Sequence, residues 1–270
     1  MKKGHPFRLV IVQARMGSTR LPGKVLLELA GRPLLGRMIE RLRQARKPDM
    51  VVIATTTEPV DDTIAELCHR EGWECFRGHP TDLLDRHLQC ARAYGATIVA
   101  KVPSDVPVVD PAVVDEVFAL YESGAYDYVS NLHPPSFPDG LDCEVFSLAA
   151  LEIAAREATR DFEREHTTPF LWDHPERFRI GNIATPDDVD YSLTHRWTID
   201  YDEDYRFLQA IFDTLYPGNP TFSWQDLTAF LKSRPDIAEL NAHLNGVVWY
   251  LHHLDELKHV DKSRVRQSPR

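Results

Sequence analysis

Residues 9–24 read LVIVQARMGSTRLPGK, and this stretch decides the fold expected for the chain. The β-favouring run from Leu9 to Val12 is typical of a strand covered on both faces of a sheet. The polar loop that follows, residues 13–24, holds two glycines and three cations. A buried strand that leads into such a loop and then into a helical pattern indicates an α/β protein.

Strands and helices alternate through the first half of the chain. The further strands expected there are residues 51–54 and 97–102, and the helices are 34–42, 61–71 and 81–94. The alternation predicts an α/β fold with an open, doubly wound, mostly parallel sheet. Ligands of such sheets bind at the carboxyl ends of the strands, where the loops 13–24, 55–60 and 103–110 should meet.

The second half of the chain is less regular. Residues 131–142 contain a proline-rich excursion, which predicts a loop. Strands are expected at 143–146, after Arg179, and at 196–199, where the last one ends at Asp200. Three helices are then expected to fill the tail.

Composition sets the broad class of protein. The chain of 270 residues carries 31 Lys and Arg against 41 Asp and Glu, a net charge of -10, which argues against a nucleic-acid partner. No apolar run approaches the roughly 20 residues of a membrane span. The four cysteines form no CxxC pair, which favours free thiols and a cytoplasmic location. We expect one domain over residues 1–260 and a disordered tail over 261–270.

The cations gather at the beginning of the chain. Residues 1–47 hold 12 Lys and Arg against Glu28 and Glu40, a balance of +10, so the remainder sums to -20. A strand, a glycine loop and cations in succession can receive a polyphosphate. The loop is not a P-loop, because five residues separate Gly17 from Gly23 and Val25 occupies the magnesium-binding position. On spacing alone, a basic surface loop is the alternative.

The stretch IVQARMGSTRLPGKVL resembles the N-terminal signature of the cytidylyltransferases that activate acidic sugars, such as the CMP-sialate and CMP-3-deoxy-octulosonate synthetases. It is most similar to the branch named for spore-coat polysaccharide biosynthesis. Further matching patches follow in order: Phe76–Arg77–Gly78, Leu84–Asp85–Arg86, residues 102–107, 139–146 and 164–169, and 196–200.

The resemblance implies a nucleotidyltransferase (nucleotide-diphospho-sugar transferase-like) fold, CTP as donor, Mg²⁺ as cofactor and a homodimer. The excursion near residues 131–142 is a candidate for the dimer contact. In the reaction it implies, an acceptor oxygen attacks the α-phosphorus of CTP and pyrophosphate leaves. The acceptor is expected to be a small anionic molecule, with a keto-deoxy sugar acid as the first candidate.

The resemblance also assigns residues to the nucleotide. Arg15 and Lys24 match phosphate-contacting cations, and together with Asp105 they form the expected catalytic set. For Arg15, a surface ion pair is the alternative. The nucleotide-binding residues expected from the resemblance are Ala14, Arg15, Gly17, Ser18, Arg20, Lys24, Arg77 and Ser104.

Two aspartates match the family's metal ligands. Asp105 follows an expected strand, and Asp200 follows another. Carboxylate oxygens are ligands that Mg²⁺ prefers. Ser104 stands where the family commonly has glycine, and Asp202 is close enough in sequence to assist. The alternative for Asp200 is a helix N-cap.

Other polar residues are assigned to the acceptor. Asp142 and Glu144 alternate with apolar residues, which places both carboxylates on one face of a strand. Arg164 and His166 lie where the family approaches the sugar or its partner subunit. A solvated polar face is the alternative for each. In the tail, His252, Glu256 and His259 have helical spacing, and we expect a wet helix face there and not a metal site.

Two other functions remain open on the sequence. The pattern Asp200–Tyr201–Asp202 also occurs in glycosyltransferases that bind a metal-bound nucleotide sugar, although such enzymes do not need the cation-rich loop. A protein that binds a nucleotide without catalysis is the third possibility, and the presence of both Asp105 and Asp200 argues against it.

Overall fold

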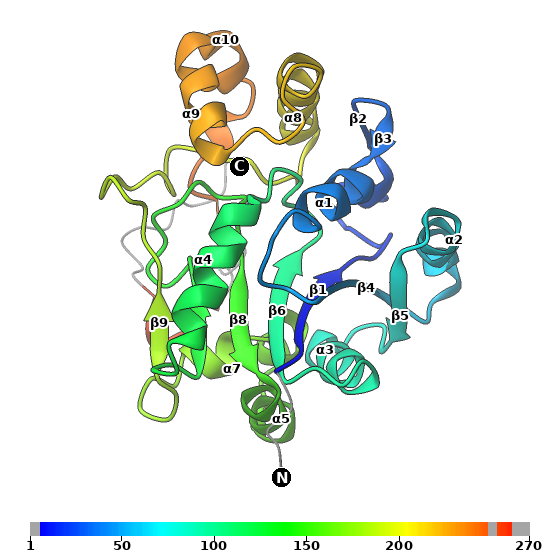
Figure 1. The fold of residues 1–270 in the computed structure, drawn as a ribbon, viewed down its shortest axis with the longest axis vertical. Helices are drawn as coiled ribbons and strands as arrows, with labels where there is room; N and C mark the ends of the chain where they lie inside the picture. Colours follow the sequence, from blue (N-terminus) through cyan, green and yellow to red (C-terminus); the bar gives the residue numbers. More distant parts are fainter. Residues whose placement is uncertain (1–5, 248–252, 261–270) are drawn as a thin grey trace.

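A seven-stranded sheet forms the centre of the computed structural model, which describes residues 6–247 and 253–260 (Figure 1). The strand order is β5-β4-β1-β6-β8-β7-β9. The strands are β1 (Arg8–Gln13), β4 (Met50–Thr56), β5 (Glu74–Gly78), β6 (Ile98–Pro103), β7 (Tyr128–Ser130), β8 (Glu144–Ser147) and β9 (Ile180–Asn182). Strands β2 (Glu28–Leu29) and β3 (Arg32–Pro33) pair separately. The expected tail at 261–270 and His252 lie outside the described residues.

Strand β1 lies inside the sheet because its apolar run is covered on both faces. Leu9, Val10, Ile11 and Val12 are fully buried, and β1 pairs in parallel with β4 and β6. Among the described strands of this sheet, only β8 runs antiparallel to its neighbours. The predicted α/β class and mostly parallel sheet are therefore confirmed.

Helices cover both faces of the sheet. One core contains side chains of α1 (Leu34–Leu42), α2 (Asp62–Glu71), α4 (Pro111–Glu122), α8 (Asp202–Leu215), α9 (Trp224–Ser233) and α10 (Pro235–Ala238). The other contains side chains of α3 (Leu83–Ala93), α5 (Leu148–Glu157), α6 (Asp161–His166) and α7 (Pro169–Trp172). Val10 and Val12 of β1 face the first core, while Leu9 and Ile11 face the second, as the period of two in a strand requires.

The tail helices gather at one end of the molecule. Figure 1 shows α4 in front of the sheet and α8, α9 and α10 together at the top of the view. Short 3₁₀ turns occur at Lys24–Leu26, Pro59–Asp61 and Ala242–Leu244. None of the helices in residues 6–247 and 253–260 has the length and apolar character that a membrane span requires.

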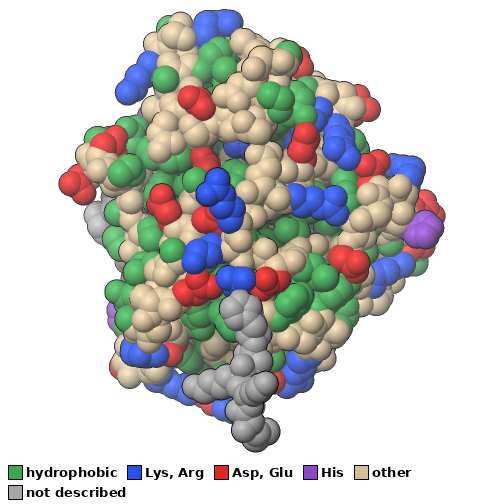
Figure 2. All heavy atoms as spheres, in the orientation of Figure 1, with side chains coloured by type: hydrophobic (Ala, Val, Ile, Leu, Met, Phe, Trp, Pro, Cys, Tyr) green, Lys and Arg blue, Asp and Glu red, His purple; other side chains and the backbone are tan. Residues whose placement is uncertain are grey.

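Acidic partners neutralise much of the positive charge of residues 1–47. Arg8 pairs with Asp49 at 2.9 Å and with Glu122 at 3.0 Å, and Lys47 pairs with Glu122 at 2.6 Å. On the face drawn in Figure 2, basic and acidic side chains lie next to one another. The excess of cations in the sequence is therefore not a uniformly basic surface on this face.

The expected strand at residues 196–199 is wrong. This segment is extended but forms only an isolated bridge between Asp139 and Arg196. Its backbone groups bond to irregular loops: Trp197 N donates to the Asp139 carbonyl at 2.6 Å, and Ile199 N donates to the Asp105 carbonyl at 3.0 Å. Because its neighbours are turns and not a strand, no ladder continues.

The alternative role of Asp200 as a helix N-cap is also wrong. Helix α8 begins at Asp202, and its N-cap is Tyr201. The cap comes from the Asp204 carboxylate, which accepts bonds from the N–H of Asp200 at 2.9 Å and of Tyr201 at 3.1 Å. The Asp200 side chain is therefore available for other contacts.

The predicted proline-rich loop, residues 131–142, is confirmed, and Gly140 fixes how it packs. Gly140 has φ of 122°, and a Cβ added there would lie 2.6 Å from the carbonyl carbon of Trp197. The loop can therefore approach the 196–199 segment only with glycine at this position.

We expect Gly140→Ala to lower the free energy of unfolding by more than about 2 kcal/mol, because the variant combines an unfavourable φ with a backbone clash. Urea unfolding of the purified proteins measures the loss. Gly218→Ala is the matched control, because an added Cβ there meets nothing within 4 Å. Equal losses for the two variants would contradict the packing argument.

Candidate active site

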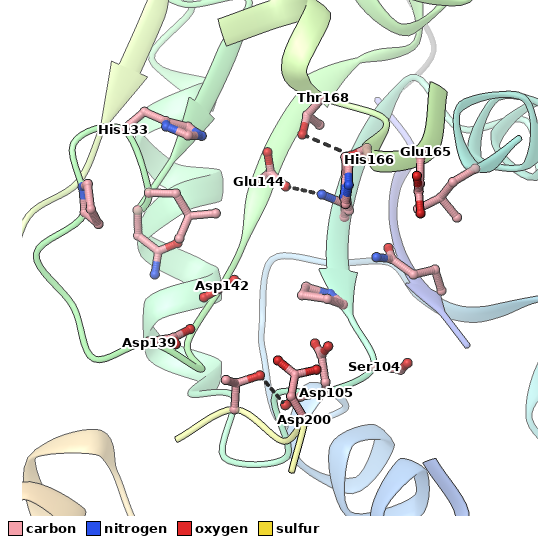
Figure 3. Close-up of a pocket in the computed structure, with 18 of the residues that line it drawn as sticks. Ser104, Asp105, His133, Asp139, Asp142, Glu144, Glu165, His166, Thr168 and Asp200 are labelled. Atoms are coloured by element: carbon pink, nitrogen blue, oxygen red, sulfur yellow. Dashed lines mark hydrogen bonds and ion pairs between the residues drawn. The ribbon is translucent and has the colours of Figure 1, made fainter. Parts of the chain in front are cut away.

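A cavity of about 990 Å³ opens at the carboxyl ends of β1 and β6. Its wall includes the end of β1 and the loop after it, Ser104 and Asp105 after β6, and residues of the loop 131–142. In Figure 3, Asp105 and Asp200 lie next to one another at the lower end, and Glu144, Thr168 and His166 lie at the upper end. The antiparallel β8 adds its first residue, Glu144, to this edge of the sheet.

The loop after β1 is held in a compact form by its own backbone. The carbonyl of Met16 accepts bonds from the N–H of Ser18 and of Gly23, both at 3.0 Å. The N–H of Met16 donates to the buried Asp61 carboxylate at 2.6 Å. Gly23 takes the left-handed conformation with φ of 71° and starts the 3₁₀ turn that carries Lys24. These bonds direct Lys24 into the protein.

Lys24 lies between the two predicted metal ligands. Its Nζ is 2.9 Å from Asp105 Oδ2, 2.9 Å from Asp200 Oδ1 and 2.7 Å from the Ile199 carbonyl oxygen. The residue is only 8% exposed. Burial alone would lower the pKa of Lys24, but the two carboxylates outweigh burial and raise it above its usual value. The ammonium therefore stays charged at neutral pH.

A second buried cation holds Asp200 from the other side. Arg196 Nη2 lies 3.1 Å from Asp200 Oδ2, and its Nε lies 3.0 Å from Asp204 Oδ1. Arg20, which is exposed, reaches Asp200 Oδ1 at 2.6 Å. Burial opposes ionisation of Asp200, but Lys24 and the two arginines lower its pKa overall. Asp200 is therefore an ionised carboxylate whose position is fixed by several partners.

Two further cations line the cavity without a carboxylate partner among the described residues. Arg15 is exposed and forms no ion pair there, and Arg86 is 2% exposed and donates to the carbonyls of His79 and Pro80 at 2.9 and 3.0 Å. Burial, with a contribution from Arg15, lowers the pKa of Arg86 to about 10. Arg86 was not among the predicted site residues, although it lies in the matching patch Leu84–Asp85–Arg86. The pair can bind an anion.

Acidic side chains also line the cavity. Asp139 and Asp142 both line the cavity, and Figure 3 shows them on the same side of Asp105. Burial raises the pKa of Asp142, and so do Asp139, Asp105 and Glu144. Burial likewise raises the pKa of Asp139, even though Arg196 lies 3.2 Å from its Oδ2. Because their pKa values are raised, these two carboxyl groups can carry a proton near neutral pH and can then donate as well as accept hydrogen bonds.

Glu144 forms the centre of a buried polar network. Its carboxylate accepts bonds from Lys101 Nζ at 2.5 Å and from the Tyr128 hydroxyl at 2.6 Å. Burial alone would raise the pKa of Glu144, but Lys101, with Thr168 and Tyr128, lowers it overall. The expectation that Glu144 and Asp142 share one face agrees with their common place on the cavity wall, although Asp142 itself precedes β8.

Three imidazoles near this network are kept neutral. Burial lowers the pKa of His166 to about 3 and that of His133 to about 4. Burial also lowers the pKa of His87 to about 3, against the opposing effect of its bond with the Leu83 carbonyl at 2.9 Å. His87 Nε2 is buried and has no partner among the described residues. Protonation of any of these three imidazoles is therefore unfavourable in the folded protein.

We expect His87 to make the folded protein less stable as the pH falls. Between about pH 6.5, where an unfolded histidine titrates, and about pH 3, the unfolded chain binds a proton that folded His87 does not. His87→Leu should therefore flatten the dependence of the unfolding free energy on pH by up to about 1.4 kcal/mol per pH unit. Urea unfolding from pH 7 to pH 5 measures the slopes. His69→Asn, at an exposed position of α2, is the control; parallel curves for wild type and His87→Leu would refute the assignment.

The cavity brings together most of the residues selected from the sequence. Those that line it are Ala14, Arg15, Ser18, Arg20, Lys24, Ser104, Asp105, Asp142, Glu144, His166 and Asp200. Gly17, Arg77 and Arg164 do not line it. Arg77, which lies in β5, pairs with Asp62 at 2.6 Å, and Arg164 bonds to Asp82 at 2.6 Å. Both arginines are held by carboxylates outside the cavity.

The structure also places Asp202 and His259, two further residues considered in the sequence. Asp202 is exposed at the first position of α8 and does not line the cavity. His259 bonds to Asp173 at 3.2 Å, and residues 253–260 do not form an α-helix. The predicted helix face in the tail is therefore wrong within the part of the chain that the structure describes.

The donor set beside Lys24 suits a hard cation. Two carboxylates and the Ile199 carbonyl present oxygen atoms to one point, where the Lys24 ammonium now stands as a cation. Within residues 6–247 and 253–260, no group of three or more His, Cys, Asp and Glu side chains is arranged to hold a metal ion. The cluster therefore offers two carboxylates and one carbonyl, which are fewer oxygen ligands than a divalent cation takes.

Comparison with known proteins places these features in a family. Residues 9–240 match the sequence model of the cytidylyltransferases. The chain is 33% identical over 235 residues to the spore coat polysaccharide biosynthesis protein SpsF of Bacillus subtilis, with 85% of this chain and 96% of that protein covered. It is 36% identical over 118 residues to a 3-deoxy-manno-octulosonate cytidylyltransferase of Anaeromyxobacter, with 43% of this chain and 47% of that protein covered.

The solved structures agree. The structure of a cytidylyltransferase from Leptospira borgpetersenii superposes with a TM-score of 0.81 at 34% identity, and the match covers 87% of this chain and 98% of that one. The expected nucleotidyltransferase fold is therefore confirmed, as is the resemblance carried by the loop after β1. The chain belongs to the cytidylyltransferase family and is a nucleotidyltransferase.

Proposed function

We propose that the protein transfers CMP from CTP to a hydroxyl of a small acceptor and releases pyrophosphate. The single observation that carries the proposal is the cluster in which Lys24 Nζ lies 2.9 Å from both Asp105 and Asp200 at the carboxyl ends of β1 and β6. The cluster joins a cation of the loop after β1 to two carboxylates that suit a divalent metal. Family membership supports the same reaction.

The cationic wall suits the triphosphate. Arg15 and Arg86 have no carboxylate partner among the described residues and line the same cavity. Guanidinium groups bind phosphate oxygens in a fixed geometry, and they stabilise the charge that develops on the leaving pyrophosphate. We assign Arg15, Arg20, Lys24 and Arg86 to the phosphates, and the backbone of Ala14, Ser18 and Ser104 to the same nucleotide.

Asp105 and Asp200 would hold Mg²⁺, with the remaining ligands from phosphate oxygens. When bound, the ion neutralises charge on the phosphates and so favours displacement at the α-phosphorus. The residues of this chain position the reactants: Arg196 keeps Asp200 in place, and Lys24 belongs to the same set of charges. The protein therefore supplies orientation and electrostatic stabilisation without a covalent intermediate.

The acceptor would occupy the wall of Asp142, Glu144 and His166. Asp142 can accept a hydrogen bond from a hydroxyl group of the acceptor. The Lys101–Glu144 ion pair, which also lines the cavity, offers polar atoms in fixed positions. The names of the relatives point to a sugar acid such as 3-deoxy-manno-octulosonate and to polysaccharide biosynthesis. Arg164, which is bonded to Asp82 outside the cavity, is not assigned to this acceptor.

We also propose a cytoplasmic homodimer, with the loop 131–142 as the candidate contact. The cysteines support the location, since Cys68, Cys75, Cys90 and Cys143 are all free thiols. Family resemblance alone supports the dimer, and light scattering of the purified protein measures it. The glycosyltransferase suggested by the Asp200–Asp202 pattern is not favoured, because the chain matches the cytidylyltransferases and the exposed Asp202 does not join Asp200 at the cavity.

Pyrophosphate release tests the proposed reaction. The protein is incubated with Mg²⁺, each of the four nucleoside triphosphates and a panel of sugar acids, neutral sugars and sugar phosphates. We expect release with CTP and an acceptor together, and none with either alone. Transfer of a sugar from a nucleotide sugar, with no pyrophosphate from any pair, would instead establish the glycosyltransferase.

We expect Asp105→Asn and Asp200→Asn each to lower kcat/KM by at least about 100-fold, because each removes a charged oxygen ligand from the proposed metal site. Asp202→Asn is the matched control and should keep nearly full activity, since Asp202 is exposed outside the cavity. Circular dichroism checks that all three variants are folded. Wild-type activity in the first two, or an equal loss in the control, would refute the assignment.

A further inference from the structure

The Lys24 ammonium uses every one of its hydrogen-bond donors inside the carboxylate cluster. An ammonium carries three N–H groups, and Nζ has three oxygen acceptors: Asp105 Oδ2, Asp200 Oδ1 and the Ile199 carbonyl, at 2.9, 2.9 and 2.7 Å. The side chain is also almost fully buried. Lys24 thus leaves no donor for a phosphate while it stays in this position.

The same three oxygens are the ones that a divalent cation would take. The ammonium and a metal ion cannot share that point, because both are positively charged and both need the same lone pairs. Arg20 and Arg196 add two more positive charges beside Asp200, at 2.6 and 3.1 Å. A free divalent cation that approaches the cluster therefore meets two carboxylates that already have cationic partners.

A triphosphate changes this balance in two ways. It offers Lys24 anionic oxygens in exchange for Asp105 and Asp200, and it brings the additional oxygen ligands that two carboxylates and a carbonyl do not supply. Lys24 lines the cavity, and its four-carbon stem has enough rotatable bonds for the ammonium to move without a change in the fold. Arg20, which is exposed on the same loop, can make the same exchange.

We propose that the cluster takes a divalent cation only as a complex with a nucleoside triphosphate, in exchange for the Lys24 ammonium, which then contacts the phosphates. This inference rests on the proposed function for the identity of the triphosphate as CTP. Lys24 thus has two successive partners: it occupies the metal position in the free protein and binds phosphate in the complex. Metal and nucleotide binding are then coupled, and by linkage each raises the affinity for the other equally.

Mn²⁺ serves as the probe, because its electron paramagnetic resonance signal falls when the ion is bound. The full chain is titrated with Mn²⁺ alone and with Mn²⁺ plus CTP, after subtraction of the Mn²⁺ held by CTP without protein. For wild type, we expect binding at least tenfold tighter with CTP than without it. CTP binding measured calorimetrically with and without Mn²⁺ should show the same factor.

Lys24→Met tests the exchange directly. We expect this variant to bind Mn²⁺ without nucleotide at least tenfold more tightly than wild type, because the competing ammonium is gone, and to lose part of the gain from CTP. Lys24→Arg, which keeps a cation, should still exclude free Mn²⁺. Lys47→Met is the matched control for loss of a lysine, because Lys47 pairs with Glu122 away from the cavity, and it should behave as wild type.

The results separate this inference from the proposed function. Equal Mn²⁺ affinity of wild type with and without CTP, or no gain in Lys24→Met, would overturn the exchange even if CTP supports pyrophosphate release. If CTP tightens Mn²⁺ binding but no acceptor supports pyrophosphate release, the exchange of Lys24 for the metal is upheld and the proposed CMP transfer is not. If Lys24→Met does not fold, as thermal unfolding would reveal, the wild-type coupling alone decides.

Discussion

A buried ammonium between two carboxylates connects the parts of this enzyme that lie far apart in the sequence. Lys24 belongs to the loop after β1, Asp105 to the turn after β6, and Asp200 to the extended segment before α8. Removing one partner of a buried pair leaves an uncompensated charge, typically at a cost of about 3–5 kcal/mol. The contact therefore fixes the position of the 196–200 segment, for which the sheet offers no ladder.

The supporting contacts explain why this segment can be irregular and still be well placed. Arg196 bonds to Asp200 and Asp204, and Asn241 donates to the Arg196 carbonyl at 2.9 Å. Gly140 lets the loop 131–142 lie directly on the backbone of Trp197. Side chains and loops thus satisfy the backbone groups that a neighbouring strand would otherwise satisfy. The Asp105–Asp200 end of the site is thus assembled on polar contacts between loops.

The cations that are concentrated at the beginning of the sequence do not form one basic region in the folded protein. Many cations of residues 1–47 pair with acids of later elements, as Arg8 and Lys47 do with Glu122 of α4. Arg15 has no carboxylate partner in the described chain, and it faces the same cavity as Arg86. The reaction proposed above would use the cations of this cavity for the leaving anion and its carboxylates for the metal and the acceptor.

The sequence by itself determined the α/β class, the mostly parallel character of the sheet, the helices of the first half and the polar loop after β1, because these follow from local periodicity and from a family signature that spans the chain. It did not predict strands β5 and β7. It did propose Lys24, Asp105 and Asp200 individually as site residues. Only the tertiary structure decided that these three meet at one point, that Arg86 joins the cavity, and that Arg77 and Arg164 are held outside it by Asp62 and Asp82. It also decided that residues 196–199 are not a strand. These outcomes depend on contacts between residues distant in sequence, whose partners and burial no local pattern specifies.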